Sequence, residues 1–255
     1  MALPVYEIKD ELRLAIDDIK SCWVDLARGG QLPDVTLARD LCLEETAELQ
    51  KAIMNLSVAY AEAEADADRD DVYSILETTN VKNAFIEIID ALADMLVVYS
   101  QLHMITHPDV SLKTSIHQGA LMSSCMLSAS EIVNHTLDLL DVNQTDVSVD
   151  PMTLFIFNLS GYLRVEPEIE KFGLMTFFDA VKEVSRSNWS KFPLDEYIQN
   201  PVQECLDIEL RSKGRYTGVG YEIKETAAGD VYVFRADSGK VVKPSTFSEP
   251  NFARK

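Results

Sequence analysis

The spacing of hydrophobic and polar positions predicts a chain that is helical over most of its length. Apolar residues recur every three or four positions over residues 5–27 and 34–63, which is the repeat of an amphipathic helix. In residues 83–100, NAFIEIIDALADMLVVYS, they continue almost all the way round the helical wheel, so we expect a helix that is buried on every side. Further helices are predicted over residues 109–141, 151–163 and 174–184.

The pattern changes after residue 213. The stretch GYEIKETAAGDVYVFRADSGKVV alternates apolar and polar residues and contains turn sequences at 228–230 and 237–239, which is typical of a small β-meander. A ribbon of two or three strands is only marginally stable alone, so we expect it to pack on the helices. We therefore predict an all-α body, a helical bundle over residues 1–213, followed by a β-ribbon and tail over residues 214–255.

Three acids interrupt the apolar helix 83–100. Glu87, Asp90 and Asp94 are spaced i, i+3, i+7, so they project from one strip of the helix. Burying one uncompensated carboxylate costs several kcal/mol, and neighbouring like charges add to that cost. A cation is therefore expected against this strip.

The helix 34–63 carries a matching feature. Glu45 and Glu48 fall inside its apolar stripe, where the core is expected. If the two stripes face each other, carboxylates from both helices converge. A set of oxygen ligands without histidine or cysteine suits a hard cation such as Mg²⁺ or Mn²⁺.

This pair of acidic motifs resembles a known pattern. Glu45-x-x-Glu48 followed by Glu87-x-x-Asp90 is similar to the ExxE…ExxD pattern of the MazG-like superfamily of all-α nucleoside triphosphate pyrophosphohydrolases. The sequences EETAEL and EIIDALADMLVV are especially similar to the small MazG-like enzymes of phages and bacteria, and so are EVSRSNWSK (183–191) and GKVVKPSTFSEPNF (239–252). The chain departs from the pattern in the long acidic insert EAEADADRDD and in residues 108–172, which match no part of it.

The resemblance implies a bundle of this type and a reaction. We expect Mg²⁺-dependent hydrolysis of a nucleoside or deoxynucleoside triphosphate to the monophosphate and pyrophosphate, with dGTP or GTP as the first choice and dUTP or dCTP left open. In this hypothesis the metal is held by Glu45, Glu48, Glu87 and Asp90, with Asp94 as a further ligand or an anchor behind them. Glu48 is the expected general base, with Glu45 as the other catalytic carboxylate.

Three further residues are expected to contact the substrate. By resemblance, Asn188 and Lys191 bind the nucleotide; from residue type alone, they equally fit an ordinary helix C-terminus. Lys243 follows the last predicted turn, where it either reaches the phosphates or is an ordinary edge-strand lysine.

A second hypothesis is that the chain is a non-catalytic helical interaction protein, in which the buried acids form ion pairs with Arg39, Lys82 or Lys191.

The composition of the chain limits the kinds of binding partner and the compartment that we expect. The chain has 42 acidic and 23 basic residues and a net charge of −19, which argues against binding polymeric nucleic acid. The four cysteines are widely spaced and are expected to be reduced thiols. We find no signal peptide or membrane span and expect a cytoplasmic protein, in the host cytoplasm if it is phage-encoded. Relatives in the superfamily form homodimers or homotetramers, and the small residues within 109–141 suit such an interface.

Overall fold

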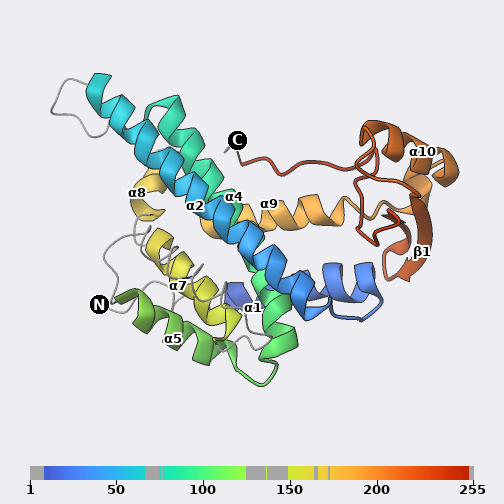
Figure 1. The fold of residues 1–255 in the computed structure, drawn as a ribbon, viewed down its shortest axis with the longest axis horizontal. Helices are drawn as coiled ribbons and strands as arrows, with labels where there is room; N and C mark the ends of the chain where they lie inside the picture. The colour runs from blue at the N-terminus through green and yellow to red at the C-terminus, as the bar shows by residue number, and fades with distance from the viewer. Residues whose placement is uncertain are drawn as a thin grey trace. The chain divides into compact units, whose positions relative to one another are not determined.

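The computed structural model describes residues 9–66, 75, 77–124, 136, 149–163, 166–171 and 173–252. Over this part the chain is mostly helical, with a small two-stranded antiparallel sheet near its C-terminus (Figure 1), which confirms the prediction at that level. The elements are α1 (Lys9–Ile19), the π-helix η2 (Lys20–Leu26), α2 (Val35–Asp66), α4 (Thr79–Thr106), α5 (Leu112–Ser124), α7 (Pro151–Leu163), α8 (Glu166–Lys171), α9 (Phe177–Trp189), the 3₁₀-helix η3 (Asp195–Tyr197), α10 (Pro201–Arg211), β1 (Gly220–Thr226) and β2 (Gly229–Arg235).

The chain forms two compact units. The first unit comprises Met1–Ile19, Leu32–Lys182 and Phe252–Lys255, and the second comprises Lys20–Gln31 and Glu183–Asn251. The second unit therefore includes helical segments from both ends of the chain as well as the sheet, whereas the predicted boundary at residue 213 assigns those segments to the helical body.

The start of α2 follows from its local sequence. The carboxylate of Asp34 accepts a hydrogen bond from the backbone N–H of Thr36 at 2.8 Å, which satisfies one of the donors that a helix N-terminus leaves open. Just before it, Gly29 and Gly30 have φ of 62° and 85°, a left-handed conformation that ends the preceding helix and that glycine adopts without steric cost.

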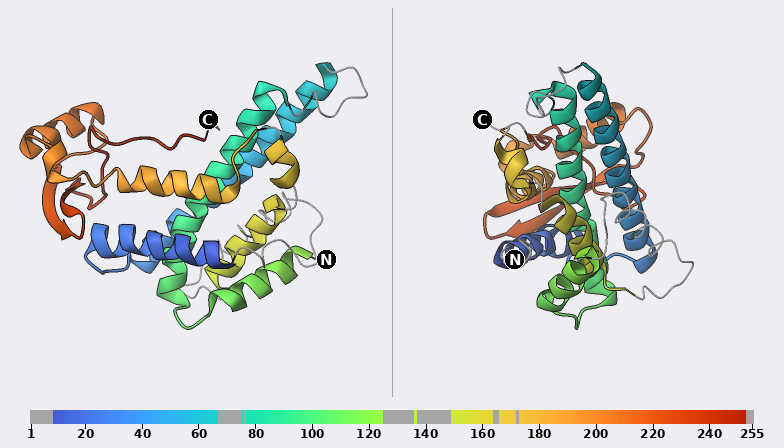
Figure 2. Two further views of the ribbon diagram at one scale, coloured as in Figure 1. Left: turned by 180° about the vertical axis from the view of Figure 1, so that it is seen from behind. Right: turned by 90° about the vertical axis from the view of Figure 1, so that its left-hand side faces the viewer.

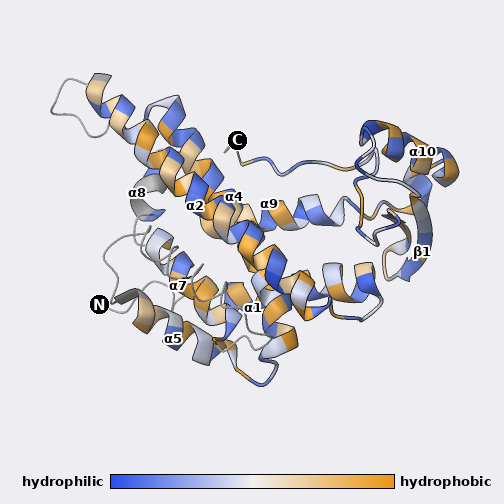
Figure 3. Cartoon of the chain, viewed as in Figure 1, coloured by the Kyte–Doolittle hydropathy of each residue, from blue (hydrophilic) through white to orange (hydrophobic). Residues whose placement is uncertain are grey.

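α2 and α4 pack against each other in the first unit and lie side by side in every view (Figures 1 and 2). Hydrophobic positions run along both helices (Figure 3). Most of α4 is buried, including Leu92, Met95 and Tyr99, but it is not buried on every side. Its more open strip passes through the acids themselves: Glu87 is exposed, and Asp90 and Asp94 are half-buried.

The expectation of a helix with no wet face is therefore wrong. The physical reason is that the carboxylates of α4 remain partly hydrated, because only the remaining faces of the helix are covered by neighbouring elements. The helix that is buried nearly all round is α7, in which Phe155 and Phe157 are fully buried.

α5 packs closely on α7. A Cβ added at Gly119 would lie 2.7 Å from both Cβ of Ile156 and the carbonyl oxygen of Thr153, so only glycine allows this approach. Gly119 lies in the predicted segment of small residues, and at this point that segment packs inside the first unit. Two predicted regions lie partly outside the described residues. These are the acidic insert, at residues 67–71, and the predicted helix 109–141 with the loop that follows it, at residues 125–135 and 137–148.

The second unit is built around the sheet. β1 and β2 form an antiparallel hairpin in which Thr226 pairs with Gly229, and the next segment adds only an isolated bridge from Arg235 to Val241. Val231, Val233 and Phe234 of β2 are buried against the surrounding segments. The ribbon is thus embedded in its unit, as its marginal stability alone requires.

Candidate functional site

The register of α2 and α4 is fixed by two side-chain hydrogen bonds. The hydroxyl groups of Thr46 and Tyr99 lie 2.6 Å apart, and the amide of Asn55 donates to Oε2 of Glu87 at 2.8 Å. Because the residue number rises along α2 as it falls along α4, the two helices run antiparallel. This arrangement brings the two predicted acidic motifs to the same stretch of the helix pair.

Glu45 is the carboxylate with the most unusual surroundings. It is half-buried, and its Oε2 atom is buried without a hydrogen-bond partner. Burial, followed by the negative charges of Asp94, Glu48, Glu44 and Asp90, raises the pKa of Glu45 to about 8. Carboxylates of both helices therefore act on one another at this point.

Not all of the predicted metal ligands lie among the carboxylates that act on Glu45. Asp90 and Asp94 of α4 face Glu45 of α2 closely enough to raise its pKa, and so does Glu48, which is exposed. Glu87 is not among the charges that act on Glu45, and its carboxylate is exposed and bonded to Asn55. We call Glu45, Glu48, Asp90 and Asp94 the acidic cluster.

The acidic cluster suits a hard divalent cation by its chemistry. Its donors are all carboxylate oxygens, and the unsatisfied Oε2 of Glu45 is a buried acceptor that a cation would satisfy. Within the described residues, however, no group of three or more His, Cys, Asp or Glu side chains is arranged to hold a metal ion as it stands. Holding a cation therefore requires some of these side chains to change rotamer.

The predicted substrate residues all belong to the second unit. Lys191 donates from Nζ to Oδ1 of Asn188 at 2.8 Å, and its Nζ lies 4.7 Å from the centre of the Trp23 ring and 5.8 Å from that of Phe247. Nζ of Lys243 lies 4.2 Å from the centre of the Phe247 ring. Asn188, Lys191 and Lys243 are thus gathered around Phe247.

The two segments that carry the later part of the resemblance pack on each other. Asn251 donates its backbone N–H to Glu183 at 2.8 Å, Arg186 donates to the carbonyl of Glu249 at 2.9 Å, and the N–H of Ser248 donates to Ser190 at 3.0 Å. The chain after residue 247 therefore runs along the end of α9. These contacts hold the Asn188 and Lys191 region against the tail that contains Lys243.

Sequence reasoning missed a buried polar pair in the first unit. Nδ1 of His103 lies 2.6 Å from Oδ1 of Asp150. At the start of α7, the backbone N–H of Met152 donates to the same Oδ1, and that of Thr153 donates to Oδ2. Burial raises the pKa of Asp150, but hydrogen bonds from His103, Ser115 and Thr153 outweigh it and hold the pKa at about 2. The signal that was available is an aspartate directly before a proline-led helix, which is a typical N-cap.

Comparisons of the chain with protein-family models, with curated proteins and with solved structures found no match. Within the described part of the chain, no helix combines the length and the apolar character needed to cross a membrane.

Proposed function

We propose that this protein is a Mg²⁺-dependent nucleoside triphosphate pyrophosphohydrolase of the MazG-like type. The observation that carries the proposal is the unsatisfied, buried Oε2 of Glu45, which lies among the carboxylates of two antiparallel helices. A carboxylate in such a place is costly unless a proton or a cation accompanies it. A site of this kind on two helices is what the ExxE and ExxD motifs imply.

In this proposal the acidic cluster holds the cation. Glu45, Asp90 and Asp94 are the half-buried members and would bind it, with Glu48 at the exposed edge and Glu87 added as the resemblance implies. Mg²⁺, when bound, offsets the charge of the phosphate oxygens and lowers the pKa of a nearby water molecule. Mn²⁺ has the same preference for oxygen ligands and is expected to substitute.

The residues of the chain then act on water and substrate. Glu48 accepts a proton from the attacking water, and its exposure lets it pass that proton to solvent. The water oxygen bonds to the α-phosphorus, the bond from this phosphorus to the bridging oxygen breaks, and pyrophosphate leaves with the monophosphate as the second product. Asn188, Lys191 and Lys243 are proposed to bind the nucleotide, with a guanine triphosphate as the preferred substrate and dUTP or dCTP as the alternatives.

The test is a panel of nucleoside triphosphates incubated with Mg²⁺, in which pyrophosphate and orthophosphate are measured separately. We expect pyrophosphate, and we expect Glu45→Gln and Asp90→Asn to reduce its release by about a hundredfold or more. Glu62→Gln is the matched control, because Glu62 is an exposed acid elsewhere on α2. Release of orthophosphate contradicts the proposed reaction, and no release by any triphosphate favours the non-catalytic interaction protein.

We also propose that the protein is a homodimer or a homotetramer, as in the relatives that the sequence resembles. Mass measurement by light scattering tests this directly, and a monomer at the concentration used in the activity assay contradicts it.

A further inference from the structure

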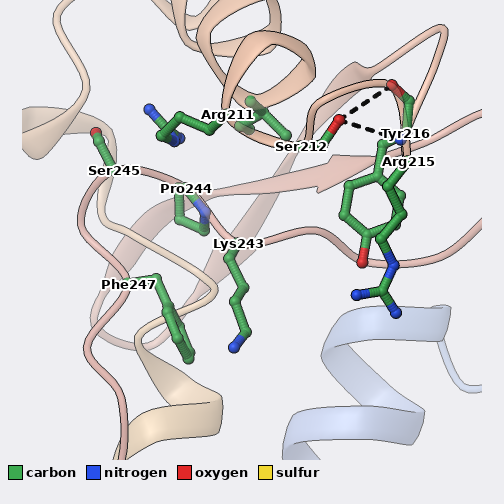
Figure 4. Close-up of a pocket in the computed structure, with 9 residues that line it drawn as sticks. Arg211, Ser212, Arg215, Tyr216, Lys243, Pro244, Ser245 and Phe247 are labelled. Carbon is green, nitrogen blue, oxygen red and sulfur yellow. Dashed lines mark hydrogen bonds between the residues drawn. The ribbon is translucent and has the colours of Figure 1, made fainter.

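The second unit contains a cavity of which only Lys243 has a role in the proposed reaction. It has a volume of about 600 Å³ and lies between the end of α10, the turn that follows it and residues 243–247 (Figure 4). This volume falls in the range of small-molecule sites. Its polar and aromatic lining comprises Arg211, Ser212, Arg215, Tyr216, Lys243, Ser245 and Phe247.

The lining is cationic in a strongly acidic chain. Arg211 donates to Glu204 at 2.8 Å, and Lys243 donates to Glu249 at 2.8 Å. Within the described residues, Arg215 forms no ion pair with a carboxylate; its guanidinium lies 5.4 Å from the centre of the Tyr216 ring. Three cations against two acids leave one net positive charge here, although the whole chain carries −19.

The side chains converge on one part of the cavity. Figure 4 shows the amine of Lys243, the hydroxyl of Tyr216 and the guanidinium of Arg215 pointing to the same side. The backbone of Tyr216 is held by its N–H, which donates to the hydroxyl of Ser212 at 3.1 Å. The site thus offers two cations and a hydroxyl to one ligand, which is the donor set that phosphate oxygens accept.

A buried acid keeps the opposite wall in place. Glu204 accepts hydrogen bonds from Arg211, from the backbone N–H of Ser245 at 2.7 Å and from its hydroxyl at 2.8 Å. Of the N–H groups of Arg211, the described residues engage only Nη2, so its other donors remain available. Because these side chains are already held in place, ligand binding costs less conformational entropy on this wall.

We infer that this cavity binds the phosphate groups of a phosphorylated small molecule of about nucleotide size, and that it does so without a metal ion. Arg215, Lys243 and the hydroxyl of Tyr216 contact the phosphates, and Arg211 adds a third cation from the far wall. The inference is argued from the cavity itself, but it shares Lys243 with the proposed substrate residues, and a nucleoside triphosphate and its pyrophosphate product both carry the required groups.

The experiment is calorimetric titration of the full chain with pyrophosphate, and separately with GTP, in EDTA. We expect binding that weakens as ionic strength rises. Arg215→Met and Lys243→Met should each weaken it by about tenfold or more, because each removes a charged hydrogen-bond donor. Lys240→Met is the matched control, since Lys240 is an exposed lysine on the same segment but outside the cavity, and it should bind like the wild type.

The results separate the sources of the ligand. Similar affinities for pyrophosphate and GTP indicate recognition of phosphate alone, whereas tighter binding of GTP adds a contact with the nucleoside. Absence of binding in EDTA overturns the inference, as does binding that Arg215→Met and Lys243→Met leave unchanged. Arg215→Lys, which keeps the charge, should retain most of the affinity and guards against an effect on folding.

Glu45→Gln separates this inference from the proposed function. It should abolish pyrophosphate release if the acidic cluster is catalytic, but it should leave binding in EDTA intact. If Glu45→Gln loses the activity of the wild type but keeps its binding, both proposals are supported. If the wild type itself shows no activity but binds, only the cavity proposal is supported. Loss of metal-free binding in Glu45→Gln, with the fold intact, overturns the assignment of binding to this cavity.

Discussion

The hydroxyl of Thr46 on α2 lies 2.6 Å from the hydroxyl of Tyr99 on α4, and this hydrogen bond joins the two helices at a fully buried point. Thr46 donates its single hydroxyl hydrogen to the carbonyl of Cys42, also at 2.6 Å, so its oxygen accepts from Tyr99. Burial, followed by the neighbouring Cys42 thiol, raises the pKa of Tyr99 well above its ordinary value and keeps the phenol a donor. The bond fixes the register that brings Glu45 opposite the acids of α4.

Replacing Thr46 by valine should therefore destabilise the protein. Thr46→Val conserves the shape of the side chain but leaves the hydroxyl of Tyr99 buried without an acceptor. We expect the free energy of unfolding to fall by about 1–3 kcal/mol. Denaturant unfolding followed by circular dichroism measures this change.

The double variant provides the control. Tyr99→Phe in the Thr46→Val background removes the stranded donor, so the double variant should be more stable than Thr46→Val alone. A double variant that is less stable than Thr46→Val would show that the hydrogen bond is not the source of the effect.

Local patterns predicted the features that depend on neighbouring residues. The helix predicted over residues 34–63 is observed as α2, and residues 151–163 form one helix with the predicted bounds. The sequence predicted that carboxylates of the two helices converge if their apolar stripes face each other, and Asp90 and Asp94 of α4 do act on Glu45 of α2, whereas Glu87 does not. That convergence needs only two amphipathic helices packed through their apolar stripes.

Features that depend on the rest of the molecule were not predictable in the same way. Counting apolar residues ranked α4 as the fully buried helix, but burial is decided by how many elements cover it, and α7 is covered more completely. The cavity around Arg215 joins residues near 211 to residues near 245, and no spacing along the chain connects them. The available hint was Arg211 and Arg215, two cations four residues apart in an acidic chain.

Removing the carboxylate of Asp150 should destabilise α7 and its contact with α4. Asp150→Ala loses the cap on Met152 and Thr153 and the bond to His103, so we expect the free energy of unfolding to fall by about 2 kcal/mol at pH 7. Asp109→Ala, at an exposed acid, should change it little.

The acid dependence of stability gives a second test of Asp150. Its pKa of about 2 in the folded protein lies below the ordinary 3.8, so its contribution is present above pH 3.8 and is lost as pH falls through 2. Acid unfolding curves of the wild type and Asp150→Ala should therefore converge below about pH 2. A constant difference between the curves across this range contradicts the assigned role.

Glu45 should produce the opposite dependence on pH when no metal is present. Its pKa of about 8 in the folded protein is above the ordinary 4.5, so the stabilising effect of its proton is complete below pH 4.5 and is lost as pH rises through 8. Glu45→Gln removes this titration. In EDTA at pH 9 it should be more stable than the wild type by on the order of 2 kcal/mol, a value reduced for solvent screening of a half-buried group.

The difference should shrink as pH falls. At pH 5 both proteins carry a neutral side chain at this position, so their melting temperatures should be close. Glu62→Gln, on the same helix and fully outside the acidic cluster, should follow the wild type at every pH. If the melting temperature of Glu45→Gln stays below that of the wild type at pH 9, Glu45 is ionised in the folded protein without an energetic cost.

Magnesium should reverse the order of the two proteins. A cation held by the acidic cluster binds only the folded state, so Mg²⁺ at one hundred times its dissociation constant should stabilise the wild type by about 2.7 kcal/mol. Glu45→Gln loses a charged ligand and should gain much less, so at pH 8 it should melt above the wild type in EDTA and below it in Mg²⁺. Thermal melts in the two conditions, with NaCl added to equal ionic strength, separate specific binding from screening of the net charge of −19. An equal rise in both proteins would mean that Mg²⁺ acts through general screening, and the acidic cluster would then have no role as a metal site.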